Sequence, residues 1–236
     1  MTANRTSSWA RTAVAAALGS LAMTASAASW TITDLATLGG ASSLPGGINA
    51  AGLVAGSSLT AGGAQRAFLF AGGGLVDLGT LGGAHSTATG INAAGQVVGS
   101  SQTTGSAAFH AFLYSGGGMT DLGTLGGSAS FAYGINAAGQ VVGWSHMPGD
   151  AAIHGFLYSG GAMTDLNLLP EVAAFGFSSL AAYGLNDSGQ ITGYGWIGGQ
   201  YHAFLLTPVP EPETYAMFLA GLGLMGAVAK RRRARA

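Results

Sequence analysis

The sequence predicts an all-β protein built from four repeats of about 44 residues, and three observations support this prediction. The pair Asp-Leu recurs at Asp34, Asp77, Asp121 and Asp165, at intervals of 43, 44 and 44 residues. Each unit contains four short strand candidates separated by turns, and both faces of these strands are apolar, as in sheets packed between neighbours. Four-stranded units of roughly 40–45 residues, stacked face to face, are typical of a β-propeller.

The strands of one unit follow a fixed order, and we call them a, b, c and d. In the second unit, strand a ends in Gly-Ile-Asn, b is Gln96–Gly99, c is His110–Tyr114 and d is Met119–Leu125. Asn92-Ala-Ala-Gly joins a to b, because Asn suits the first turn position and Gly supplies the positive φ of a type I turn with a bulge.

The order of the strands predicts that the repeats close into a ring. The body begins with a lone strand d, Trp30–Leu38, and ends after strand c of the fourth unit, near Leu206. The first strand is therefore expected to complete the fourth unit and give a four-bladed β-propeller without open edges. The alternative is an open β-solenoid or stack of sheets, in which the two end units do not meet.

The composition excludes several classes of function. The chain has 236 residues, of which 42 are Gly, 7% are charged and none is Cys. Disulfides, thiolate catalysis and Cys-ligated metals are therefore excluded. Seven of the eight basic residues lie in the two terminal segments, and only Arg66 lies in the body. The body thus lacks the basic footprint that nucleic-acid binding requires, and no nucleic-acid partner is expected.

The N-terminus has the organisation of a secretory signal peptide. Arg5 and Arg11 form a positive region, an apolar stretch of 12 residues follows from Thr12 to Met23, and Ala25-Ser-Ala27 fits the small-residue rule for cleavage. The alternative is a short buried helix. We assign residues 1–27 to the signal peptide and residues 28–207 to the β domain.

The C-terminus, residues 208–236, resembles the PEP-CTERM sorting signal of Gram-negative bacteria. Three elements follow one another: the box Pro210-Glu211-Pro212, a short transmembrane segment over 214–229, and the basic cluster Arg231-Arg232-Arg233. Basic residues stay on the cytoplasmic side, so the body would lie outside. The resemblance implies processing by an exosortase, transient anchoring in the inner membrane, and then release to the cell surface or extracellular matrix. The alternative is a simple tail anchor.

The repeats resemble the bacterial extracellular HAF repeat family over nearly all of residues 31–207. The His-Ala-Phe triplet is complete at His110 and His202, whereas Arg66 and Gly155 depart from it. This resemblance implies an extracytoplasmic repeat protein and brings no activity with it.

The sequence gives no strong candidate for catalysis, for a cofactor or for a metal ion. The five histidines lie in the body, and three occupy the same repeat position, but Arg66 breaks the set. The repeated Asp residues lack the close spacing of a calcium loop, so hydrogen bonds at turns or strand ends are expected of them. We assign no catalytic, cofactor-binding or metal-binding residue, and we expect a protein that is not an enzyme.

Aromatic side chains in the variable bc and da loops are the candidate ligand-binding residues, because binding residues gather on loops held by a rigid scaffold. Plugging of gaps between blades is the alternative role. We expect a non-catalytic surface or biofilm-matrix protein with exopolysaccharide as its ligand. A secreted propeller-type hydrolase or lyase acting on polysaccharide is the alternative, and ice binding is disfavoured because Thr recurs only once per repeat. The candidates are Phe131, Tyr133, Trp144, His146, Phe175, Phe177, Tyr183 and Trp196.

Overall fold

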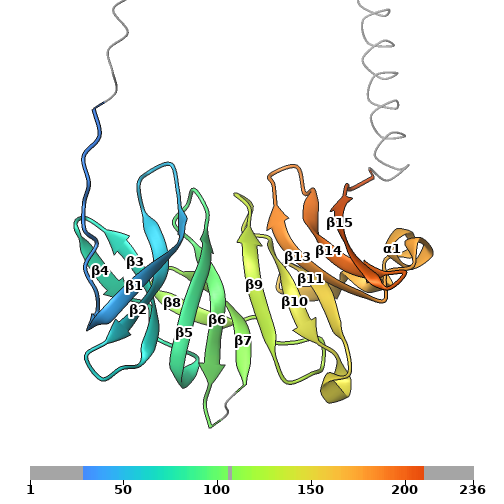
Figure 1. The fold of residues 1–236 in the computed structure, drawn as a ribbon, viewed down its shortest axis with the longest axis horizontal. Helices are drawn as coiled ribbons and strands as arrows, with labels where there is room; N and C mark the ends of the chain where they lie inside the picture. Colours follow the sequence, from blue (N-terminus) through green and yellow to red (C-terminus); the bar gives the residue numbers. More distant parts are fainter. Residues whose placement is uncertain (1–28, 106–107, 210–236) are drawn as a thin grey trace, which may run out of the picture. The chain divides into compact units, whose positions relative to one another are not determined.

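The computed structural model describes residues 29–105 and 108–209, which fold almost entirely as antiparallel β-sheets (Figure 1). Sheet 1 is β1 (Gly39–Ile48), β2 (Val54–Thr60), β3 (Gln65–Ala71) and β4 (Gly74–Asp77). Sheet 2 is β5 (Gly82–Ile91), β6 (Val97–Thr103), β7 (Phe109–Ser115) and β8 (Gly118–Asp121). Sheet 3 is β9 (Ser130–Ile135), β10 (Val141–His146), β11 (Ile153–Ser159) and β12 (Ala162–Asp165). Sheet 4 has three strands, β13 (Ser179–Leu185), β14 (Ile191–Ile197) and β15 (Gln200–Leu206).

Each sheet is a meander in which consecutive strands pair, as predicted from the repeat. Its strands correspond to a, b, c and d in order, and sheet 4 ends after c. The predicted turn from a to b is present in sheet 2, where the Gly95 amide donates to the Asn92 carbonyl at 3.0 Å and Gly95 has a φ of 78°. The all-β repeat architecture is therefore confirmed.

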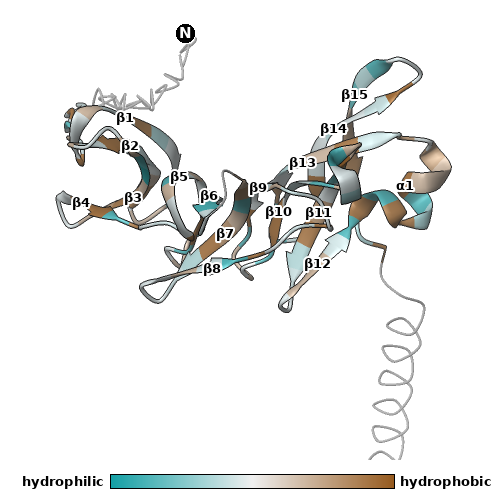
Figure 2. Ribbon diagram, turned by 90° about the horizontal axis from the view of Figure 1, so that it is seen from below, coloured by the Kyte–Doolittle hydropathy of each residue, from teal (hydrophilic) through white to brown (hydrophobic). Residues whose placement is uncertain are grey.

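The core of the protein is divided into three layers, one between each pair of neighbouring sheets. One cluster joins Ala55 of sheet 1 to Val97 and Phe112 of sheet 2, and the equivalent clusters lie between sheets 2 and 3 and between sheets 3 and 4. Figure 2 shows apolar segments within the strands along the row of sheets. The four sheets follow one another in a row, and among the described residues no core cluster joins sheet 4 to sheet 1.

The predicted strand over Trp30–Leu38 is wrong in this structure. Residues 29–37 do not form a β-strand, and Leu38 forms an isolated bridge to Thr60 of β2. Trp30 and Ile32 are 92% and 100% exposed. Ring closure, which depended on this segment, is therefore not observed among the described residues, and the four-bladed propeller stays a prediction.

A ladder of asparagine side chains connects the sheets along the row. The Nδ2 atom of Asn49 donates to the backbone carbonyl of Asn92 at 3.0 Å, Asn92 donates likewise to Asn136 at 3.0 Å, and Asn136 to Asn186 at 3.3 Å. The Oδ1 atom of Asn92 also accepts from Gln96 N within its own turn. The repeated Asn therefore both closes its turn and fixes the spacing to the next sheet.

Three short helical segments interrupt the β structure. A 3-10 turn, Pro148–Asp150, lies between β10 and β11 of sheet 3, and a second 3-10 turn, Leu166–Leu168, with the helix α1 (Pro170–Phe175) connects sheet 3 to sheet 4. Pro170 occupies the first turn of α1, and Gly176 ends it with a left-handed φ of 90°. The sequence analysis found no helix here, because six residues are too few to show a helical period.

Candidate functional site

Most of the predicted ligand-binding residues lie on strands and not on loops. Phe131 and Tyr133 belong to β9, Trp144 and His146 to β10, Tyr183 to β13 and Trp196 to β14. Phe175 ends α1, and Phe177 follows it. The strands extend further toward the variable end of each sheet than the sequence indicated. The backbone of these six strand residues is therefore fixed by the hydrogen bonds of the sheets, and the aromatic side chains form three groups.

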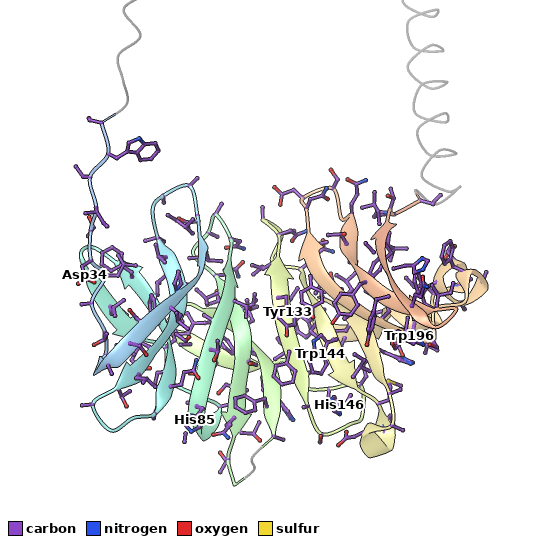
Figure 3. All side chains as sticks on the ribbon, viewed as in Figure 1. Asp34, His85, Tyr133, Trp144, His146 and Trp196 are labelled. Atoms are coloured by element: carbon purple, nitrogen blue, oxygen red, sulfur yellow. The ribbon has the colours of Figure 1, made fainter. Side chains whose placement is uncertain are left out.

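The first group, which we call the aromatic rim, consists of Phe109, Phe131, Trp144 and His146. Phe131 and Trp144 are cross-strand partners in sheet 3, and their ring centroids lie 4.4 Å apart. Phe109 of sheet 2 stacks on Phe131 at 6.0 Å, and His146 lies 5.6 Å from Trp144. Figure 3 shows Trp144 and His146 on the same part of sheet 3. All four side chains are half-buried, so one side of the row meets solvent.

Polar groups lie beside the His146 end of the rim. Asp150 accepts hydrogen bonds from the Ser128 amide at 2.8 Å and from the Ser128 hydroxyl at 2.6 Å. These bonds from Ser128, with a further contribution from His146, hold the pKa of Asp150 below its usual range. The Nδ1 atom of His146 lies 3.3 Å from Asp150. A carboxylate, a hydroxyl and an imidazole therefore border an apolar ring surface.

The second group, the tyrosine cluster, lies on sheets 3 and 4. Tyr133 contacts Tyr183 with a centroid distance of 4.5 Å, Tyr183 stacks on Tyr194 at 5.3 Å, and Tyr194 and Trp196 both meet Tyr201 edge-on. The hydroxyls of Tyr183 and Tyr194 are 3.3 Å apart. Burial, together with this hydrogen bond, raises the pKa of Tyr183.

The third group borders a groove of about 390 Å³ between α1 and β15. Phe175 and Phe177 stack at 5.1 Å, and Phe177 lies 6.0 Å from Phe204 of β15. The groove is also lined by His202 and Glu171. Five consecutive residues of β15, from His202 to Leu206, line the groove, so it lies along the edge strand of sheet 4.

The repeated Asp and the first residue of the triplet pair with each other inside each complete sheet. His110 Nδ1 lies 2.9 Å from Asp121, His154 Nδ1 lies 2.7 Å from Asp165, and Arg66 approaches Asp77 at 4.0 Å. These are pairs within one sheet and are well separated along the row. Within the described ranges, no three His, Asp or Glu side chains come together in a way that could hold a metal ion.

Sequence reasoning missed four aromatic residues of these groups as candidates, Phe109, Tyr194, Tyr201 and Phe204. Tyr194 and Trp196 alternate along one strand, and Tyr201 is the cross-strand partner of Trp196. The alternation was visible in the sequence. The partnership required the register of the hairpin, which the Gly198-Gly199 turn fixes.

Comparison with known proteins identifies one segment of the chain. Residues 208–233 match the PEP-CTERM protein-sorting motif. This match supports the resemblance described above and indicates an exosortase-processed, secreted surface protein with a transient C-terminal membrane anchor. No curated protein and no solved structure matches the chain.

The sorting box, the segment 214–229, the basic cluster and the signal-cleavage residues Ala25 and Ala27 lie outside the described residues. Among the helices that are described, none combines the length and the hydropathy needed to cross a membrane.

Proposed function

We propose that the protein is a non-catalytic component of the cell surface or biofilm matrix of a Gram-negative bacterium, and that it binds exopolysaccharide through the aromatic rim. The signal peptide exports it, the C-terminal segment holds it transiently in the inner membrane, and exosortase processing releases it to its final location. The match of residues 208–233 to the sorting motif supports the route. The rim supports the ligand class.

The continuous row of rings from Phe109 to His146 is the observation on which the ligand class rests. Sugar rings present apolar C–H faces that stack on aromatic side chains, with hydroxyl groups around their edges. Trp144 would offer the stacking surface, and Asp150 with Ser128 would offer hydrogen bonds to hydroxyl groups. The strands hold the rings in fixed positions, so little side-chain entropy is lost on binding.

Repeat chemistry supports a role without catalysis. The His–Asp and Arg–Asp pairs occur at equivalent positions of successive sheets, as expected of groups that stabilise the repeat. Hydrolysis of a glycosidic bond would instead require two carboxyl groups about 5–10 Å apart across one bound sugar. The polar groups described beside the rim include one carboxylate, that of Asp150, and not a pair.

The proposal is tested with the exopolysaccharide purified from a host that carries an exosortase. The secreted protein and its Trp144→Leu variant are compared by affinity electrophoresis in gels containing the polysaccharide. We expect the variant to lose retardation, because Leu lacks the flat ring face on which a sugar ring would stack. The melting temperature of each variant shows whether the fold is kept.

Trp196→Leu is the matched control, since it removes a tryptophan from sheet 4 and leaves the rim intact. Equal retardation of the Trp144→Leu variant and the unaltered protein would contradict binding at the rim. Retardation lost only in Trp196→Leu would assign the ligand to the tyrosine cluster. A fall in the size of the polysaccharide during incubation would replace the proposal by the alternative of a hydrolase or lyase.

A further inference from the structure

Sheet 4 ends at β15, its strand c. In the other three sheets, strand c pairs with a strand d. In sheets 1 to 3 the third strand pairs with β4, β8 or β12, whereas β15 has no partner on its outer side among the described residues. Open edges template pairing with further strands. The groove between α1 and β15 runs along this edge. Sheet 4 is therefore incomplete by one strand.

The chain contains the missing strand at its other end. Residues 31–35 read Thr-Ile-Thr-Asp-Leu, and the d strands of sheets 2 and 3 read Gly-Met-Thr-Asp-Leu and Ala-Met-Thr-Asp-Leu. Tyr114 pairs with Met119 and Phe112 with Asp121. By the same register, Leu206 would pair with Ile32, and Phe204 with Asp34. Cleavage of the predicted signal peptide before Ala28 would leave this strand at the new N-terminus.

We infer that residues Trp30–Leu35 of one copy complete sheet 4 of a second copy, so that molecules assemble head to tail. The row of sheets is open, and sheets 1 and 4 share no core cluster among the described residues of one molecule. The junction between two copies would then repeat the step from one sheet to the next inside the chain. Three contacts that recur at those steps have matching residues at the two ends.

The first recurring contact is the asparagine ladder. Asn49, Asn92 and Asn136 each donate a side-chain hydrogen bond to the carbonyl of the next repeated Asn. Asn186 is the last of the series, and its Nδ2 atom donates to Oε1 of Gln190 at 2.8 Å. A following copy would present the Asn49 carbonyl to the second hydrogen of that amide. The ladder would thus continue from one molecule to the next.

The second recurring contact is a serine that accepts from the preceding sheet. The Ala67 amide donates to Ser86 at 2.9 Å, and the Ala111 amide donates to Ser130 at 2.8 Å. Both serines are fully buried, and both donate to a carbonyl seven residues earlier. Ser43 also donates to the carbonyl seven residues earlier, Ala36, at 2.7 Å. It is therefore oriented to accept from Ala203 of a preceding copy.

The third recurring contact is the pair between strands c and d. Arg66, His110 and His154 each face the Asp of their own strand d. His202 occupies the same position in β15, and it forms no ion pair with the residues that the structure describes. In the junction His202 would face Asp34 of the second copy. The exposed Ile32 would pack beside Leu206, as Met163 packs beside Tyr158 in sheet 3.

A head-to-tail contact uses different surfaces on the two molecules, so it does not saturate at a dimer. Such contacts give rings when the rotation between copies closes, and filaments when it does not. The N-terminal strand would add to the edge of β15 by main-chain hydrogen bonds, while the register of Asp34 and Ile32 would give specificity. An exported surface protein would in this way assemble only after signal-peptide cleavage.

Cysteine cross-linking tests the junction, because the natural chain has no Cys. The full chain carrying Ile32→Cys and Leu206→Cys is exported from a bacterial host, purified in mild detergent and oxidised gently. We expect a ladder of disulfide-linked multimers on a non-reducing gel. Two single-Cys chains with tags of different size, when mixed, should give the heterodimer, and mass spectrometry should identify the disulfide-linked peptides that contain positions 32 and 206.

Ile32→Cys with Leu205→Cys is the matched control, since a shift by one residue places the two side chains on opposite faces. Excess peptide of residues 28–38 should abolish the ladder. In the unaltered chain, β15 amides should gain hydrogen-exchange protection as protein concentration rises. An intramolecular bridge at monomer size would overturn the inference in favour of ring closure. Cross-linking no greater than in the control, with concentration-independent exchange, would overturn both arrangements.

Discussion

The ring of Phe156 lies directly over Gly143, its cross-strand partner in sheet 3. A Cβ atom at Gly143 would lie 2.8 Å from two ring carbons of Phe156, and it would also overlap the Phe131 carbonyl. The same pairing of Gly and Phe joins Gly56 to Phe68 in sheet 1. The glycine of strand b therefore allows the phenylalanine of strand c to lie flat in the core.

Gly143→Ala should accordingly destabilise the protein, by about 3 kcal/mol or more, because overpacking at a rigid backbone contact has no flexible side chain to absorb it. Urea unfolding followed by circular dichroism measures the loss. Gly74→Ala is the control, since nothing lies within 4 Å of the added methyl group and Gly74 is not among the positive-φ glycines. It should be neutral or slightly stabilising. Equal stabilities of the two variants would contradict this role of Gly143.

The repeat period predicted sheets 1 to 3, because the strands and the turns recur at the same interval of 43 or 44 residues in these units. It did not define where strand a begins, and the structure shows that β1 and β5 begin at Gly39 and Gly82. Gly82-Gly83 reads as a turn, but a Cβ at Gly83 would overlap Gln102 of the neighbouring strand, so this glycine permits close approach inside a sheet. Trp30–Leu38 shows the opposite failure. Its pattern is that of a strand, but a strand also needs an edge to pair with.

The candidate site was predicted in part for a similar reason. The sequence singled out Phe131, Trp144 and His146 by their aromatic character, but it did not place them side by side. Their contact depends on the register in which Phe131 pairs with Trp144 and on the packing of Phe109 from the preceding sheet. Register and packing between sheets are tertiary properties, and one sequence without a structure does not specify them.

The asparagine ladder predicts a difference between an internal and a terminal sheet. Asn92 is buried, bonds to the Asn136 carbonyl and to Gln96, and accepts from two amides of its own turn. Asn92→Ala should lower the free energy of unfolding by about 2–3 kcal/mol, since it leaves buried groups unpaired. Asn186→Ala, at the exposed end, should cost about 1 kcal/mol. Equal losses in chemical unfolding of the dilute protein would contradict the ladder.

The hydrogen bonds to Asp150 predict its titration. The Ser128 hydroxyl and amide stabilise the charged form, so the pKa of Asp150 lies below the ordinary aspartate value of 3.8. A lowered pKa means that the bonds stabilise the fold above the unfolded-state value and that this contribution is lost as the pH falls through the folded-state value. NMR titration of Asp150 measures it. Ser128→Ala should move the pKa upward, and an unchanged value would refute the assignment.

The C-terminal segment should be a processed signal and not a permanent anchor. The match to the sorting motif covers residues 208–233, and the apolar run over 214–229 contains three glycines, which weaken it as a stable helix. Proline on both sides of Glu211 favours an extended chain that an enzyme can reach just outside the membrane. The arginine cluster would stop translocation and hold the box at that depth.

Mass spectrometry of the mature protein from an exosortase-containing host should therefore show a C-terminus near residues 210–214. Replacement of Pro210, Glu211 and Pro212 by Ala should leave the full-length chain in the inner membrane. As a control, the unaltered chain should also stay there in the same host without its exosortase. An intact Arg231–Arg233 tail on the surface-located protein would show a plain tail anchor instead.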